Sequence, residues 1–220
     1  MESEFKDSPT LKLYSVNIKD KGELNYKDEI EFLFNNTKIF GEGKEESLRY
    51  KQNGASLWLI DSVSDAKYIE QLLKKYSDKV NVINLYNDKY KKSESPLAIV
   101  NRELDNTEKY SIILSYNKLT LGVTVEKIES VVFMRDITTP ELYMQAACRA
   151  KSQYPDKCKK FSYLVSFNIE NDYDVFKEIT QHNVNEKEFL KYFPVIAVEY
   201  DSIFNHTELV EITGDSSFLN

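Results

Sequence analysis

From residue 56 onward, short apolar runs alternate with segments whose apolar residues recur at helical spacing. The apolar runs are typical of buried strands, whereas Ala66, Ile69 and Leu73 have the spacing of a helix that buries one face. This alternation is the pattern of βαβ units that build a parallel sheet. We predict strands over Ser56–Ile60, Val80–Leu85, Tyr110–Leu114, Ser130–Met134 and Phe161–Phe167, the last with enough polar alternation to lie near an edge.

Helices are predicted to follow most of these strands. The turn Asp61–Ser64 provides a cap for the first of them. The second covers 94 to 105 and has Pro96 in its first turn, where a missing backbone N–H does no harm. Two more are expected at Pro140–Lys151 and from about Asp172 to His182.

The two ends of the chain differ from this central region, so we expect three parts. Residues 1–55 form an N-terminal flanking segment, 56–185 an α/β lobe and 186–220 a C-terminal extension. Within the first part, a strand is predicted at Leu11–Ile18 and an amphipathic helix at Tyr26–Phe40.

Composition and charge narrow the class of protein. A net charge of −7 argues against a broad basic face for nucleic acid, although local basic loops are compatible with it. Cys148 and Cys158 lack metal-ligand partners at suitable spacing, so we expect reduced thiols, a buried Cys148 and no zinc. Because no apolar stretch approaches the roughly 18 residues of a membrane span and no signal peptide is recognisable, a cytoplasmic location away from membranes is expected.

The segment from Ser111 to Arg149 is the most informative about chemistry. A predicted strand is followed by the polar loop Ser115–Thr124, a second strand, and a helix that contains Gln145-Ala-Ala-Cys-Arg149. Ligands of an open parallel sheet bind at the carboxyl ends of its strands. We therefore expect a binding edge where Arg149 shares one crevice with the loop residues Ser115, Lys118, Thr120, Gly122 and Thr124.

This strand, loop, strand and helix resemble motifs V and VI of superfamily-two helicases, and residues 56–62 occupy the place of motif IV. The phrases Lys118-Leu-Thr-Leu-Gly-Val-Thr-Val125 and Thr139-Pro-Glu-Leu-Tyr-Met-Gln145 are similar to the motor subunits of type I and type III restriction systems. The resemblance covers about residues 10 to 200. It implies a three-layer RecA-like (P-loop NTPase-type) α/β domain with a mainly parallel sheet and terminal elaborations, acting as the second motor lobe of an ATP-dependent DNA helicase or translocase.

The resemblance also implies roles for individual residues. Arg149 matches the arginine finger that reaches the γ-phosphate of ATP across a lobe interface. The implied ATP interface further includes Gly122, Thr124 and Gln145. The implied contacts with DNA phosphate are Ser62, Ser115, Lys118 and Thr120. This sequence departs from the family pattern at Cys148, which replaces a glycine, and at Ser152, which replaces a second arginine.

ATP and Mg²⁺ are the cofactors that the resemblance implies for the intact parent protein. The 220 residues contain no Gly-x-x-x-x-Gly-Lys-Ser/Thr and no Asp-Glu pair that ends an apolar strand, so we expect tight binding of neither by this chain alone. The implied partners are a first RecA-like lobe in the same or another chain, DNA, and methyltransferase or specificity subunits. We expect the chain to be one piece of such a motor.

Plainer explanations stand beside these roles. Arg149 can be an ion-pairing surface arginine and Ser62 a helix cap. The cluster Lys157, Lys159 and Lys160 is most simply a solvated turn, and Trp58 a core residue. Glu42-Gly-Lys44 is too short to indicate a nuclease. The competing hypothesis for the whole chain is a non-catalytic interaction module that kept the RecA-like fold, which Cys148 and Ser152 favour.

Overall fold

The computed structural model describes residues 10–19, 26–35, 54–116, 118–119, 124–151, 161–180, 195–199 and 210–212. Its strands are β1 (Thr10–Lys19), β2 (Ala55–Leu59), β3 (Val80–Asn84), β4 (Tyr110–Ser115), β5 (Ile128–Phe133), β6 (Phe161–Ser166), β7 (Val195–Glu199) and β8 (Val210–Ile212). Its helices are α1 (Tyr26–Asn35), α3 (Val63–Leu73), α4 (Pro96–Asp105), α5 (Pro140–Arg149) and α6 (Ile169–Thr180), with a 3-10 turn η1 (Lys74–Tyr76). The strands and helices predicted from residue 56 to 185 are confirmed.

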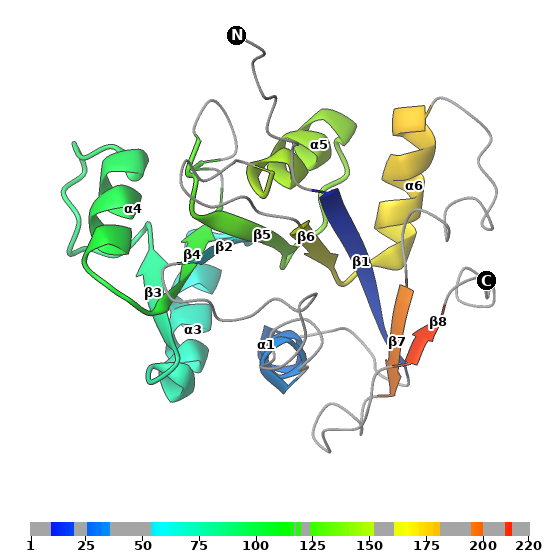
Figure 1. Cartoon of the computed structure of the whole chain (residues 1–220), viewed down its shortest axis with the longest axis horizontal. Helices are drawn as coiled ribbons and strands as arrows, with labels where there is room; N and C mark the ends of the chain where they lie inside the picture. The colour runs from blue at the N-terminus through cyan, green and yellow to red at the C-terminus, as the bar shows by residue number, and fades with distance from the viewer. Residues whose placement is uncertain are drawn as a thin grey trace, which may run out of the picture.

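The described strands form one sheet in the order β3-β4-β2-β5-β6-β1-β7-β8 (Figure 1). Every neighbouring pair is parallel except β7 and β8. The residues of β2 and β4 are buried throughout. Continuous burial is typical of parallel strands that are covered on both faces, and it explains why these segments are apolar without alternation.

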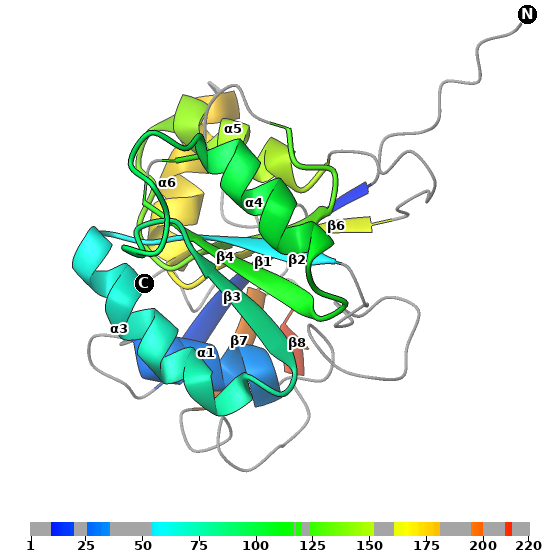
Figure 2. The ribbon, with the colours of Figure 1, turned by 90° about the vertical axis from the view of Figure 1, so that its left-hand side faces the viewer.

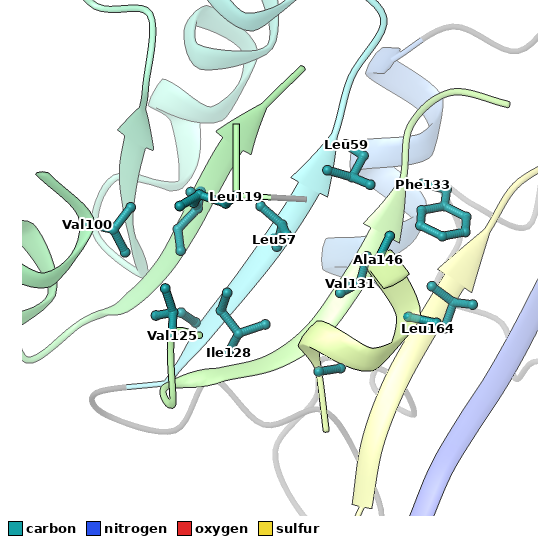
Figure 3. Packing of buried hydrophobic residues seen from close by; sticks show 14 of the residues in the cluster. Leu57, Leu59, Val100, Leu119, Val125, Ile128, Val131, Phe133, Ala146 and Leu164 are labelled. Carbon is teal, nitrogen blue, oxygen red and sulfur yellow. The ribbon is translucent and has the colours of Figure 1, made fainter. Parts of the chain in front are cut away.

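Helices cover the two faces of the sheet, as expected for a three-layer α/β domain (Figure 2). Along β2, Leu57 and Leu59 pack toward α4, α5 and α6, and Figure 3 shows part of this cluster. Trp58 and Ile60 point the opposite way and pack with α1 and α3. Successive side chains of a strand alternate between faces, so one apolar run supplies both cores. The prediction that Trp58 is a core residue is confirmed, since it is fully buried.

The position predicted for Phe161–Phe167 is wrong. β6 is not near an edge, because it pairs with β5 on one side and with β1 on the other. The polar residues that produced the alternation are small and buried: Ser162 donates a hydrogen bond of 2.6 Å to the carbonyl of Ala150, and Ser166 is 4% exposed. Strand β1 lies between β6 and β7, so the sheet extends across the boundary that the sequence suggested at residue 55.

Local sequence signals account for two helix starts. Ser95 accepts a hydrogen bond from the backbone N–H of Ala98 and caps α4, with Pro96 at the next position as predicted. Pro140 likewise occupies the first position of α5, although Thr139 before it forms no side-chain cap hydrogen bond. Among the described helices, none has the length and apolar content needed to cross a bilayer.

Candidate functional site

The predicted site residues lie at two opposite edges of the sheet. Leu59 pairs with both Ser115 and Phe133, so β2, β4 and β5 end together at the carboxyl edge. Ser62 and Lys118 follow strands at this edge. Thr124, in contrast, precedes β5, whose first residue Ile128 pairs with the start of β2. Thr124 therefore lies on the side of the amino edge.

Helix α5 carries Arg149 back to that amino edge. At its beginning, the Tyr143 ring packs edge-on against Phe133, the last residue of β5, with 4.8 Å between ring centroids. At its end, the carbonyl of Ala150 accepts the hydrogen bond from Ser162, near the start of β6. The expectation that Arg149 shares a crevice with Ser115 and Lys118 is wrong, because a helix that follows a parallel strand runs antiparallel to it. Thr124 lies on the side of Arg149.

The hydroxyl of Ser62 is used to begin helix α3. Its Oγ accepts a hydrogen bond of 3.1 Å from the backbone N–H of Asp65 and donates one of 2.6 Å to the Asp65 carboxylate. Ser64 Oγ lies 2.7 Å away. The helix-cap explanation is confirmed. The contact with DNA phosphate stays a prediction, and in this arrangement the Ser62 proton is already donated within the chain.

The loop after β4 also directs its polar groups inward. Buried Ser115 donates its hydroxyl hydrogen to the carbonyl of Lys118. The Lys118 ammonium donates a hydrogen bond of 2.9 Å to the carbonyl of Leu85 and lies 4.4 Å from the centroid of the Tyr86 ring. Leu119 has a φ of 69°, a strained value for a leucine, and its buried side chain helps to hold it. Thr120 and Gly122 lie outside the described residues.

Acidic residues surround Ser62 at the carboxyl edge. Although the Asp61 side chain is exposed, partial desolvation raises the pKa of its carboxyl. The Arg135 guanidinium opposes this shift, and the carboxylates of Asp65 and Asp136 add to it. Arg135 also lies 5.0 Å from the centroid of the Tyr116 ring. A phosphate bound at Ser62 would meet these carboxylates.

Arg135 and Tyr116 were missed by the sequence analysis. Arg135 follows β5 and Tyr116 follows β4, and only the strand register brings the two side chains together. No local spacing in the sequence signals such a pair.

The surface of α5 presents the other predicted residues. Gln145 and Cys148 are exposed and Arg149 is half-buried, whereas Ala146 and Ala147 pack inward. The prediction of a buried Cys148 is wrong, because the helical phase that buries the alanines turns this thiol outward. Thr124 is also exposed.

A buried hydrogen bond anchors α5 to α6. The Tyr143 hydroxyl donates to the Asp172 carboxylate at 3.0 Å, and both side chains are at most 2% exposed. Burial, together with this carboxylate, raises the pKa of Tyr143 well above its ordinary value. The bond therefore fixes the helix on which Gln145 and Arg149 stand.

Other residues singled out in the sequence lie outside the described part of the chain: Ser152, Cys158, Lys157, Lys159, Lys160 and the segment 42–44. Among the residues that are described, no three His, Cys, Asp or Glu side chains are arranged to hold a metal ion.

No protein-family model matches the chain. It is 26% identical over 136 residues to the C-terminal part of a candidate type II restriction enzyme and methyltransferase from Mycoplasma pneumoniae. The alignment covers 56% of this chain and 19% of the relative, so the chain spans about a fifth of that protein.

Solved structures share the fold at low sequence identity. The C-terminal domain of the DEAD-box protein Dbp5 is 15% identical with a TM-score of 0.53, covering 86% of this chain and 91% of that one. The Saccharomyces cerevisiae Dbp5 bound to RNA and ADP BeF3 is 15% identical with a TM-score of 0.52, over 89% of this chain and 43% of that one. The ATP-dependent type ISP restriction-modification enzyme LlaBIII bound to DNA is 12% identical with a TM-score of 0.51, over 96% of this chain and 18% of the enzyme. The chain therefore has the RecA-like fold of the C-terminal lobe of DEAD-box helicases, a fold that it also shares with part of a restriction-modification enzyme.

Proposed function

We propose that this chain is the second motor lobe of an ATP-dependent DNA helicase or translocase in a restriction-modification system of the type I or type III kind. The fold of a helicase C-terminal lobe supports the motor, and the relative from Mycoplasma pneumoniae supports the restriction system. A first RecA-like lobe, in the same or another chain, supplies the rest of the ATP site. Methyltransferase or specificity subunits complete the assembly.

The observation that carries this proposal is the placement of Arg149. It stands in the last turn of α5 at the amino edge, on a helix that Tyr143 anchors, with exposed Gln145 one turn earlier. A first lobe docked at this edge brings the ATP γ-phosphate to Arg149, beside Thr124 and Gln145. Gly122 is the further contact that the resemblance implies.

The chemistry of Arg149 suits a phosphoryl group. A guanidinium is always charged and presents planar donors that match phosphate oxygens. When bound, ATP with Mg²⁺ supplies the phosphoryl group whose transfer drives the motor. Arg149 stabilises the charge that develops on it, which in other nucleotide hydrolases accelerates the reaction by roughly 10³- to 10⁵-fold. In this proposal the first lobe holds the Mg²⁺ together with the ATP.

DNA contacts the carboxyl edge in this proposal, through Ser62, Ser115, Lys118 and Thr120. The hydroxyl protons of Ser62 and Ser115 already donate within the chain, so these two bonds must open before the hydroxyls can donate to phosphate. The Lys118 ammonium donates one of its three hydrogens to the carbonyl of Leu85 and can donate another to phosphate. Such contacts hold any sequence and carry affinity rather than specificity.

Substitution of Arg149 tests the proposal. DNA-stimulated ATP hydrolysis is measured with this chain combined with a P-loop lobe of the same restriction system. Arg149→Ala is expected to lower the turnover rate by roughly 10³-fold or more while ATP still binds, and Arg149→Lys to restore little of it.

Arg102→Ala is the matched control. Arg102 also stands in the last turn of a helix, but this helix is α4, and Arg102 forms an ion pair with Glu94. An Arg149→Ala enzyme that turns over at the rate of the Arg102→Ala enzyme would falsify the arginine finger.

The second candidate is a non-catalytic interaction module. It is favoured by Cys148 and Ser152, which stand where the helicase motif has a glycine and a second arginine. In that case the assembled complex forms, and its ATP hydrolysis is unaffected by Arg149→Ala.

A further inference from the structure

The hydrogen-bond ladder between β3 and β4 stops short at the carboxyl edge. Asn84 pairs with Leu114, and the N–H of Leu85 still donates to the carbonyl of Leu114 at 3.4 Å. In a parallel ladder that continued in this register, the N–H of Tyr116 would donate to the carbonyl of Leu85. Each of these two backbone groups is instead bonded to a side chain.

The side chains of Tyr86 and Lys118 take the places of the backbone partners. The Tyr86 hydroxyl accepts a hydrogen bond of 2.9 Å from the N–H of Tyr116. The Lys118 ammonium donates one of 2.9 Å to the carbonyl of Leu85. The two side chains also contact each other, since the ammonium lies 4.4 Å from the centroid of the Tyr86 ring. Tyr86 therefore contacts the loop after β4 at its first residue and again at Lys118.

Tyr86 is itself held firmly. It follows β3, the outermost described strand on this side of the sheet, and its ring packs against the cores on both faces (Figure 2). Its N–H donates a hydrogen bond of 2.9 Å to Oδ1 of Asn84, and the amide of Asn84 donates one of 2.8 Å to the Glu70 carboxylate on α3. Asn84 is buried, which strengthens these bonds. A side chain fixed by packing and by supporting hydrogen bonds can hold another residue in place.

The loop that Tyr86 contacts needs such support. Leu119 has a φ of 69°, which a leucine keeps only when its surroundings hold it. Its side chain is buried in the core cluster of Figure 3, and the Lys118 carbonyl accepts the Ser115 hydroxyl hydrogen. These contacts fix the backbone around Lys118. The contacts with Leu85 and Tyr86 fix its side chain.

We propose that Tyr86 is the positioning residue of this loop: it holds Lys118 ready for DNA phosphate and thereby sets how much DNA the motor needs. This inference rests on the proposed function, which makes Lys118 a contact with DNA phosphate. A side chain that is already ordered loses less conformational entropy when a ligand binds. In this arrangement Tyr86 increases the affinity of the loop for DNA through Lys118.

Limited digestion of the full chain with trypsin tests the positioning without ATP or DNA, because the bond after Lys118 is cut only when the loop opens. Tyr86→Phe keeps the ring and removes the hydrogen bond from Tyr116, so cleavage after Lys118 is expected to be about five-fold faster. Tyr86→Leu also removes the ring beside the ammonium and should speed the cleavage further. Mass spectrometry of the fragments identifies the bond that is cut.

Tyr76→Phe is the matched control. Tyr76 is also half-buried, and its hydroxyl forms a hydrogen bond of the same length, 2.9 Å, with the Glu31 carboxylate of α1. This variant should be cut after Lys118 at the rate of the unmodified chain. Cleavage that Tyr86→Phe does not speed would overturn the inference. Equal acceleration by Tyr86→Phe and Tyr76→Phe would also overturn it, because any small loss of stability would then open the loop.

DNA-stimulated ATP hydrolysis, measured with a P-loop lobe of the same restriction system, tests the consequence for the motor. Tyr86→Phe is expected to raise the DNA concentration for half-maximal stimulation by about five-fold and to leave the maximal rate and the KM for ATP unchanged. A loss of folded enzyme would lower the maximal rate instead. A lower DNA requirement would contradict the inference, because Tyr86 would then withhold Lys118 from DNA.

The two experiments separate this inference from the proposed function. Faster cleavage after Lys118 with an unchanged DNA requirement rejects the DNA contact of Lys118, which belongs to the proposed function, and keeps Tyr86 as the residue that positions the loop. Unchanged cleavage rejects the role of Tyr86 alone. A motor that Arg149→Ala does not slow rejects the arginine finger, and the cleavage rates then decide on Tyr86.

Discussion

At the amino edge of the sheet, Gln145 and Arg149 stand on a helix whose position depends on a buried hydrogen bond. At the carboxyl edge, the polar groups of Ser62, Ser115 and Lys118 bond to the chain itself. Chemistry at the first edge thus depends on how firmly a helix is held. At the second edge, the hydroxyls of Ser62 and Ser115 stabilise a helix start and a loop. The charges at this edge belong to other side chains, among them Asp61 and Arg135.

The largest effect is expected where the amino edge is anchored. Tyr143→Phe removes the hydrogen bond that the buried Asp172 carboxylate accepts and keeps the ring, so the free energy of unfolding should fall by about 1 to 3 kcal/mol in urea denaturation. Tyr173→Phe on α6 is the control, since that ring is only half-buried, and a change below about 0.5 kcal/mol is expected there.

The same pair predicts a dependence on pH. The pKa of Tyr143 is raised in the folded chain, so its contribution to stability is complete below the unfolded value of about 10 and is lost as the pH rises through the higher folded value. Tyr143→Phe should therefore flatten the alkaline fall in stability. An equally steep fall in both proteins would show that ionisation of the Tyr143 hydroxyl does not cause the loss of stability at alkaline pH.

Most of the fold was predictable because each strand and helix is specified locally. The apolar run at residues 56–60 and the spacing of Ala66, Ile69 and Leu73 identify β2 and α3 without tertiary information. Position within the sheet was less predictable. The serines of β6 have the pattern of an edge strand, but hydroxyls as small as that of Ser162 can be buried when a carbonyl accepts their proton.

The sequence predicted candidate site residues but not their arrangement. The loop after β4 and the helix after β5 are near each other in sequence, yet the antiparallel course of α5 separates Ser115 from Arg149 by the length of a strand. Asp61, Arg135 and Tyr116 meet only through the register of three strands. Sequence spacing carries no information on such contacts.

An intermediate effect is expected at the carboxyl edge, from Ser62. Ser62→Ala removes the cap of α3, so the free energy of unfolding should fall by about 1 kcal/mol, as for other serine caps. Ser95→Ala, which removes the corresponding cap of α4, should cost a similar amount. Because the proposed function makes Ser62 a contact with DNA phosphate, the Kd for a DNA duplex should rise for Ser62→Ala and stay unchanged for Ser95→Ala. An equal Kd for the two variants would leave Ser62 with the helix cap alone.

The smallest effect is expected from the carboxylates at the same edge. The test is whether substitution of Asp61 raises or lowers the free energy of unfolding. Because partial desolvation and neighbouring carboxylates raise the pKa of Asp61, its contribution to stability is present below its ordinary pKa and is lost as the pH rises through the folded value. At neutral pH, Asp61→Asn should therefore raise the free energy of unfolding, by less than about 0.5 kcal/mol because the side chain is exposed. The gain should disappear in acid. Asp105→Asn is the control and should lower the free energy of unfolding at neutral pH, since the Asp105 carboxylate lies 3.0 Å from the Lys127 ammonium. If both variants change the free energy of unfolding in the same direction, the carboxylates around Ser62 do not repel one another measurably.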